Sequence, residues 1–78
     1  MWVMSFDGRN IFDARYFRIT RNIGGKAEGK YAIQGFYSAS ELGSCVCGLY
    51  PDEERAAAEL EKILAAVEED VKVYRFSK

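Results

Sequence analysis

Residues 50–67, YPDEERAAAELEKILAAV, mark the point where the hydrophobic pattern of the chain changes from a period of two to a helical period. Asp52 is a typical N-cap, and the two glutamates that follow it favour the positive end of a helix dipole. Apolar residues then recur on one helical stripe: Ala56, Leu60, Ile63, Leu64 and Val67. The acidic run 68–70 is unfavourable at the negative end of the dipole, so we expect the helix to stop there.

On both sides of this helix the sequence alternates between apolar and polar residues, which is typical of β-strands. Strands are expected at 1–6, 10–14, 15–22, 31–39, 45–50 and, after the helix, 71–76. Asp7-Gly8 predicts a hairpin turn because both residues tolerate positive φ, and 40–44 predicts a second turn. A run of strands followed by one helix is typical of an α+β domain. We expect one domain, 1–78, with an antiparallel sheet of about five strands packed on one C-terminal helix and a short strand after the helix.

Size and composition limit the class of protein. The chain has 78 residues, of which 49% are hydrophobic, and this is enough for one core and argues against disorder. It contains no apolar run of ~18 residues that would span a membrane, and its first ten residues lack the features of a signal peptide. We therefore expect a soluble cytoplasmic protein.

Charge is distributed unevenly along the chain. Residues 1–30 carry six basic and three acidic side chains, a net charge of +3, whereas residues 31–78 carry five basic and nine acidic ones, a net charge of −4. Such polarity favours binding of a nucleic acid or association between copies of the chain.

The segment GGKAEGKY at 24–31 is similar to the start of a phosphate-binding P-loop. Such a loop must be followed at once by a helix, whose N-terminus contributes positive potential to the phosphate site. Here the following residues alternate as a strand, and Tyr31 replaces the Ser or Thr that binds the metal. We expect a glycine-rich loop between two strands and no phosphate site.

Cys45 and Cys47 are expected to point to the same face of a strand, together with Leu49. The chain has no histidine, so one copy cannot complete a tetrahedral zinc site with two thiols, although two copies could supply four sulfurs. A disulfide between residues two apart would be strained. We interpret both cysteines as small buried apolar side chains, with a dimeric metal site or a reactive thiol as alternatives.

A basic and aromatic strand offers a candidate surface for single-stranded nucleic acid, in which aromatic rings stack on bases and cations contact phosphates. Its candidate residues lie between positions 15 and 30: Arg15, Tyr16, Phe17, Arg18, Arg21, Lys26 and Lys30. Alternation divides the cations between two faces, since Arg18 lies with Tyr16 whereas Arg15 and Arg21 lie with Phe17. A solvated strand with flanking charges is the simpler interpretation.

Residues for catalysis are not evident. Without histidine the chain lacks the usual general base near neutral pH, and its serines have no partner base nearby in sequence. The acids 52–54 and 68–70 lie at opposite ends of the expected helix, too far apart to share a substrate. We expect no enzymatic activity, no cofactor and no bound metal.

Three segments resemble a group of short Firmicutes-type bacterial and prophage proteins that start with Met-Trp-Ile or Met-Trp-Val. They are the start Met1-Trp2-Val3 with Asp7-Gly8, the segment 48–56 (GLYPDEERA), and the ending Val73-Tyr74-Arg75-Phe76. The group's Leu-Gly pair is inverted here, and Asp52 replaces its usual threonine, which also caps helices. The segment 19–30 has no counterpart in the group. This resemblance implies a common fold and assigns no function and no site residues.

One helix can cover only one face of such a sheet, so the opposite face should expose aromatic residues. The candidates are Trp2, Phe12, Phe36, Tyr37, Tyr50 and Tyr74. Because exposed apolar patches mark interaction surfaces, we expect a non-enzymatic interaction module that forms a two-fold dimer or binds another protein. Binding of single-stranded nucleic acid through residues 15–30 is the alternative.

Overall fold

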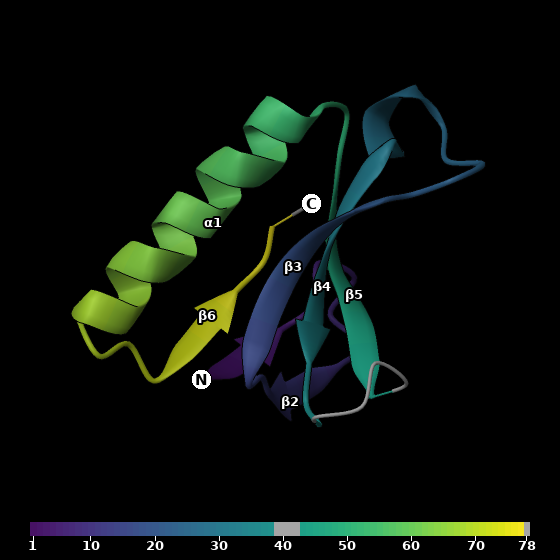
Figure 1. Cartoon of the computed structure of the whole chain (residues 1–78). Coiled ribbons are helices and arrows are strands. Elements are labelled where there is room, and N and C mark those ends of the chain that lie inside the picture. The colour runs from purple at the N-terminus through teal and green to yellow at the C-terminus, as the bar shows by residue number, and fades with distance from the viewer. Residues whose placement is uncertain (39–42, 78) are drawn as a thin grey trace.

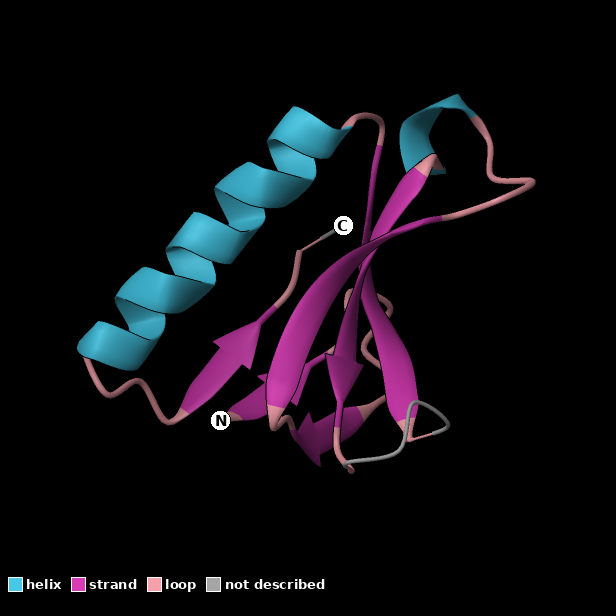
Figure 2. Ribbon diagram, viewed as in Figure 1, coloured by secondary structure: helices cyan, strands magenta, loops and turns pink. Residues whose placement is uncertain are grey.

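The computed structural model describes residues 1–38 and 43–77. In chain order its elements are β1 (Trp2–Met4), β2 (Ile11–Asp13), β3 (Tyr16–Arg21), the 3₁₀ helix η1 (Ala27–Gly29), β4 (Tyr31–Phe36), β5 (Ser44–Tyr50), α1 (Glu53–Glu68) and β6 (Val73–Arg75) (Figures 1 and 2). The expected α+β class and the order of strands and helix are therefore confirmed. The turn expected at 40–44 lies largely outside the described residues.

The strands form two sheets of three, so the expectation of about five strands in one sheet is wrong. Sheet A has the order β2-β1-β6 and sheet B the order β3-β4-β5. The chain passes from one sheet to the other at Ala14 and Arg15: the Ala14 amide donates to the Met1 carbonyl in sheet A (2.8 Å), and the Arg15 amide donates to the Phe36 carbonyl in sheet B (2.6 Å). Alternation predicts strands but not their partners, and for this reason it did not reveal the division.

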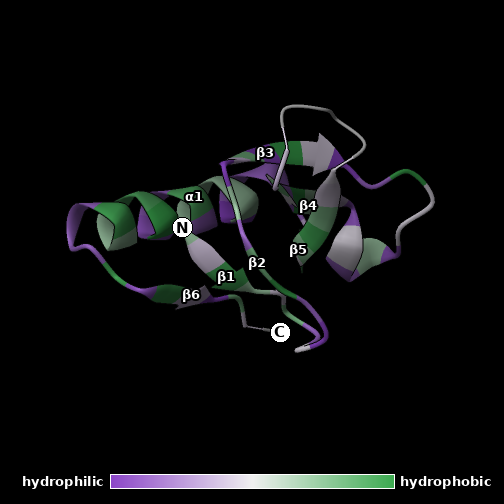
Figure 3. Cartoon of the chain, turned by 90° about the horizontal axis from the view of Figure 1, so that it is seen from below, coloured by the Kyte–Doolittle hydropathy of each residue, from purple (hydrophilic) through white to green (hydrophobic). Residues whose placement is uncertain are grey.

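Sheet A also departs from the expected antiparallel arrangement. β1 pairs with β2 in the antiparallel sense and with β6 in the parallel sense, so that Trp2 lies opposite Asp13 on one side and Val73 on the other. The long segment through α1 carries the chain back beside its first strand, which a parallel pair requires. In Figure 3, β6, β1 and β2 lie side by side.

The core lies between the inner faces of the two sheets and α1. Its buried residues come from every layer, including Val3 of β1, Ile33 of β4, Cys47 of β5, and Ala56 and Ile63 of α1. The helix lies beside sheet B and β6 (Figure 1) and contacts β3, β4 and β5. Sheet A and α1 therefore cover the inner face of sheet B together, since neither is large enough to cover it alone.

Helix α1 begins and ends as expected. The Asp52 carboxylate accepts a hydrogen bond from the Arg55 amide (2.8 Å), which confirms the N-cap, and the helix ends at Glu68. Its expected apolar stripe is only partly right, because the buried residues are Ala56, Ile63 and Ala66, while Leu64 and Val67 are more than half exposed. The helix thus approaches the sheet through its alanines and turns two large apolar residues to solvent.

A β-bulge in β5 corrects the expected side-chain directions there. Val46 lies opposite Gln34 but Gly48 lies opposite Ile33, so Cys47 is an additional residue in this strand. Cys47 and Gly48 are both buried as a result, and Leu49 points to the outer side of sheet B instead of sharing a face with the cysteines. A period of two cannot predict such an insertion.

Candidate interaction surfaces

The outer face of sheet A is the surface of that sheet turned away from the core. It is formed by Trp2, Met4, Ile11, Asp13, Val73 and Arg75, which are register partners across the three strands. On the opposite side Val3 is fully buried, and its partners Phe12 and Tyr74 pack against the core. Sheet A therefore has one buried face and one face open to solvent.

Apolar side chains dominate the centre of this outer face. Trp2 is 50% exposed and Ile11 is 56% exposed, and the half-buried Met4 and Val73 lie beside them. A lone exposed apolar residue needs no explanation, but register partners on three adjacent strands form a continuous patch. This patch is the strongest indication of an interaction surface in the described part of the chain.

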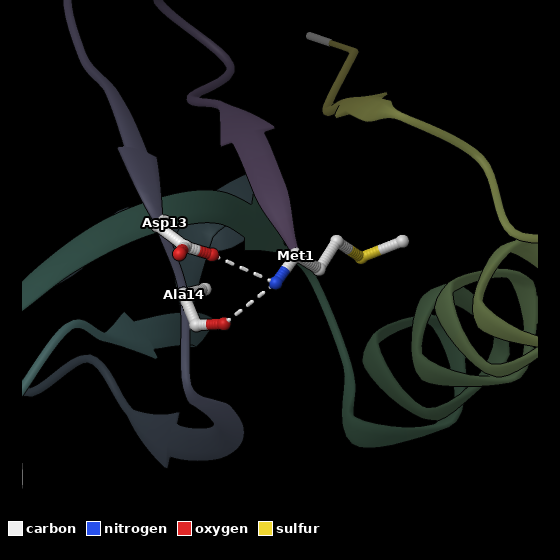
Figure 4. Close-up of polar contacts among 3 residues, drawn as sticks. All are labelled: Met1, Asp13 and Ala14. Atoms are coloured by element: carbon white, nitrogen blue, oxygen red, sulfur yellow. Dashed lines mark hydrogen bonds and ion pairs between the residues drawn. The ribbon is translucent and has the colours of Figure 1, made fainter.

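Asp13 forms one corner of the face. Its Oδ1 atom accepts a hydrogen bond from the N-terminal ammonium of Met1 (2.9 Å), which also donates to the Ala14 carbonyl (3.1 Å) (Figure 4). The Met1 side chain is 10% exposed, and the Asp13 side chain is 62% exposed. Solvent, or a partner, can therefore reach the Asp13 carboxylate.

Arg75 forms the diagonally opposite corner, on β6. It is exposed, and no ion pair or hydrogen bond joins its side chain to another residue in the part of the chain that the structure describes. The outer face thus combines an apolar centre with one acidic and one basic corner.

The aromatic residues expected on an uncovered face differ in their exposure to solvent. Trp2 and Tyr37 are indeed half exposed, whereas Phe12, Tyr50 and Tyr74 pack against the core. Phe36 is only 2% exposed, because the Tyr16 ring stacks on it with centroids 4.5 Å apart. The expectation was therefore right for two of the six residues and wrong for the other four, of which Phe36 is covered by a neighbouring strand and not by the helix.

The basic and aromatic residues between 15 and 30 are divided as the alternation predicted. Tyr16 and Arg18 lie on the outer side of sheet B, where the Arg18 guanidinium is 5.8 Å from the Phe36 ring centroid. On the inner side Phe17 packs near Phe76, with ring centroids 6.2 Å apart, and the Arg21 guanidinium lies 5.7 Å from the Tyr31 ring centroid.

The remaining members of that set lie at the ends of β3 and in the loop. Arg15 is exposed immediately before β3, and Lys26 and Lys30 are exposed on either side of η1. The structure therefore does not bring the seven residues together on one face, and binding of nucleic acid stays a prediction from the sequence.

The glycine-rich loop is a connection between antiparallel strands, as expected. Only the three-residue η1 lies within it, and Lys30 is followed by β4 and not by a helix. The Asn22 side-chain amide donates to the Gly29 carbonyl (2.7 Å), and Gly24 has φ +84°. The loop's polar groups stabilise a turn, and the helix N-terminus that a P-loop needs is missing in this segment.

Cys47 is a buried core residue, as interpreted from the sequence, and Cys45 is half buried. Burial raises the pKa of the Cys47 thiol to about 12, and the neighbouring Cys45 adds to this effect. Burial also raises the pKa of Cys45.

Within residues 1–38 and 43–77, no three Cys, Asp or Glu side chains are grouped so that they could hold a metal ion. The described helices include none that is long and apolar enough to cross a membrane.

Two tyrosines and a glutamate form a polar cluster beneath α1 that sequence reasoning missed. The Tyr74 hydroxyl donates to the Glu59 carboxylate, and the Tyr50 hydroxyl is buried close by without a hydrogen-bond partner among the described residues. Burial, followed by the effects of Glu59, raises the pKa of both phenols. Because the three residues come from β5, α1 and β6, no local pattern in the sequence could bring them together.

An open, mostly apolar pocket of about 300 Å³ lies elsewhere on the surface, lined by Phe6, Glu28, Leu49 and Ser77.

Comparison of the chain with protein-family models, curated proteins and solved structures found no match. The function must therefore be inferred from the surfaces described above.

Proposed function

We propose that this protein is a non-enzymatic interaction module that associates with a second copy of itself through the outer face of sheet A. The observation that carries this proposal is the continuous apolar centre of that face, with Trp2 and Ile11 each half exposed or more. A folded protein that leaves an aromatic and a β-branched side chain adjacent on an open sheet gains free energy when they are covered.

A second copy suits this face because the face carries charges of both signs. A partner with a single sign of charge would attract the charge at one corner and repel the charge at the other. An identical face can place its Arg75 against Asp13 and its Asp13 against Arg75. The face comprises six side chains, well below the roughly 20–30 residues that each partner contributes to a standard interface. We therefore expect weak, reversible association in the micromolar range or above.

The tryptophan at the centre of this face gives a direct readout, because Trp2 is the only tryptophan in the chain. Sedimentation velocity and tryptophan emission are measured from about 1 to about 500 µM protein, the range set by the weak association expected for so small an interface. We expect the mean mass to rise with concentration and the emission to shift to the blue as the indole ring leaves water.

Ile11→Gln should weaken the association, because it places an amide in the apolar centre of the face. Leu64→Gln is the matched control: Leu64 is a similarly exposed apolar residue, but it lies on α1 and is not part of the outer face of sheet A. A monomer at every concentration would refute the proposal, and so would association that Leu64→Gln disrupts and Ile11→Gln does not.

A further inference from the structure

The outer face of sheet A is a grid of two rows of three residues. In one row Met4 lies between Ile11 and Arg75, and in the other Trp2 lies between Asp13 and Val73. The acid and the base therefore occupy diagonally opposite corners, with four apolar residues between them.

We propose that two copies pack face to face about a two-fold axis perpendicular to the Asp13–Arg75 diagonal, so that Arg75 of each copy meets Asp13 of the other. This rests on the self-association proposed above and specifies its geometry. The arrangement forms two identical ion pairs, one at each end of the interface, and stacks the apolar centres between them.

Other two-fold axes within the interface are unfavourable. An axis along the strands would place Asp13 on Val73 of the other copy, and an axis across the strands would place it on Ile11. Either arrangement covers the Asp13 carboxylate with an apolar side chain and leaves the Arg75 guanidinium without an anion, which is unfavourable for a charge that loses its water. The axis perpendicular to the Asp13–Arg75 diagonal gives both charges a partner.

This axis also fixes the angle at which the strands of the two copies cross. With strands ~4.8 Å apart and ~6.8 Å for two residues along a strand, the strands of the two copies would cross at about 70°. This lies near the orthogonal class of sheet packing, in which strands cross at close to right angles.

The Asp13 carboxylate can serve this second role although it already holds the N-terminal ammonium. The ammonium contact uses Oδ1, and an ionised carboxylate accepts several hydrogen bonds on its two oxygens. The Asp13 side chain is 62% exposed, so its carboxylate is open to solvent. Arg75 can therefore approach from the solvent side without displacing the N-terminus.

Charge reversal tests the geometry. In Asp13→Lys two copies would place lysine against Arg75, and in Arg75→Glu they would place glutamate against Asp13, so each variant alone should associate about tenfold more weakly or worse. An equimolar mixture should form a heterodimer at least as strong as the wild-type dimer, because both of its contacts pair opposite charges. Native mass spectrometry with one variant isotopically labelled counts the heterodimer directly.

The control pair is Glu61→Lys with Arg9→Glu, two exposed charges outside this face. These substitutions change the net charge of the chain by the same amounts, so they report any general attraction between oppositely charged copies. We expect neither loss in the single variants nor gain in the mixture. A gain equal to that of the Asp13 and Arg75 pair would overturn the proposal.

The possible results separate this geometry from the proposed function. If the wild-type protein associates but the Asp13→Lys and Arg75→Glu mixture gives no preferred heterodimer, this arrangement is wrong and self-association stands. If Asp13→Lys loses its native circular dichroism, a double-mutant cycle with Asp13→Asn and Arg75→Gln replaces it. Coupling between the two sites in the dimer dissociation constant supports the pairing, and additive effects refute it.

Discussion

Gly35 lies at a point where the two sheets approach too closely for a side chain. A Cβ atom at this position would lie 2.8 Å from Cζ of Phe12 and 3.0 Å from Sγ of Cys47. Gly35→Ala should therefore lower the free energy of unfolding by about 1–3 kcal/mol, because the Phe12 ring or the backbone must move. Urea denaturation monitored by circular dichroism measures the change.

Gly29→Ala is the control for Gly35→Ala. A Cβ atom there would meet its nearest neighbour, Cδ1 of Leu49, at 3.5 Å, an ordinary contact. We expect a change within about 0.5 kcal/mol. If both variants lose the same stability, the close contact between Gly35 and Phe12 does not exist in solution.

Single residues were predictable from the sequence where their role is local. Asp52 caps a helix that begins one residue later, and this could be predicted from neighbouring residues alone. The requirement for glycine at position 35 arises from Phe12 on another strand, and the burial of Phe36 arises from Tyr16. Contacts between residues far apart in sequence leave no periodic signal.

The C-terminal end of helix α1 is closed by a Schellman motif. The Asp70 amide donates to the Val67 carbonyl (3.1 Å), and the Val71 amide donates to the Ala66 carbonyl (3.0 Å). Asp70 has φ +57°, a conformation that glycine adopts more readily than other residues, and its charge faces the negative end of the helix dipole.

Asp70→Gly should therefore raise the free energy of unfolding by about 0.5–1 kcal/mol, as measured by urea denaturation. Asp70→Ala removes the same charge but keeps a Cβ atom at positive φ, so it should be less stable than Asp70→Gly. A glycine variant less stable than the wild-type protein would contradict this account of the helix end.

For helices and strands, the sequence predicted the hydrophobic period of each element but not the elements that it packs against. Alternation predicted every strand, and the change of period at Pro51 predicted α1. It did not predict that Ala66 would be buried while Leu64 and Val67 face solvent, because a stripe that wraps widely around the helix leaves its rotation open. The bulge at Cys47 was missed for a similar reason, since one inserted residue interrupts the alternation on which the prediction relied.

The whole molecule should lose stability in alkaline solution. Burial raises the pKa of Cys47 to about 12, and burial together with Glu59 raises the pKa of Tyr50 and Tyr74 from the ordinary value of 10.0. Above about pH 9 the unfolded chain begins to lose these protons while the folded chain keeps them, so the free energy of unfolding falls as pH rises. Their contribution is fully present below pH 9 and is lost progressively above it.

Urea denaturation between pH 7 and pH 11.5 measures this loss, and absorbance at 295 nm shows when the phenols ionise. We expect two of the five tyrosines to ionise only as the protein unfolds. Tyr74→Phe removes one of these protons and should make the alkaline decline shallower. An equally steep decline in Tyr74→Phe would show that Tyr74 does not contribute.

The candidate surface was predictable in kind but not in place. The reasoning that one helix cannot cover both sides of a sheet anticipated an open face with Trp2 on it. The division into two sheets decides which residues accompany Trp2, and that division depends on the hydrogen bonds of Ala14 and Arg15. Ile11, Asp13, Val73 and Arg75 become neighbours only when β6 pairs with β1, a parallel contact between opposite ends of the chain.

That parallel contact determines how the fold bears mechanical load. Tension applied between Trp2 and Phe76 would pull β1 and β6 in opposite directions along their length, so that their hydrogen bonds, including the one from the Phe76 amide to the Met4 carbonyl, would have to break together. Strands sheared in this way resist extension more than strands that are unzipped one bond at a time. The outermost strands of the sequence thus act as a clamp across the rest of the molecule.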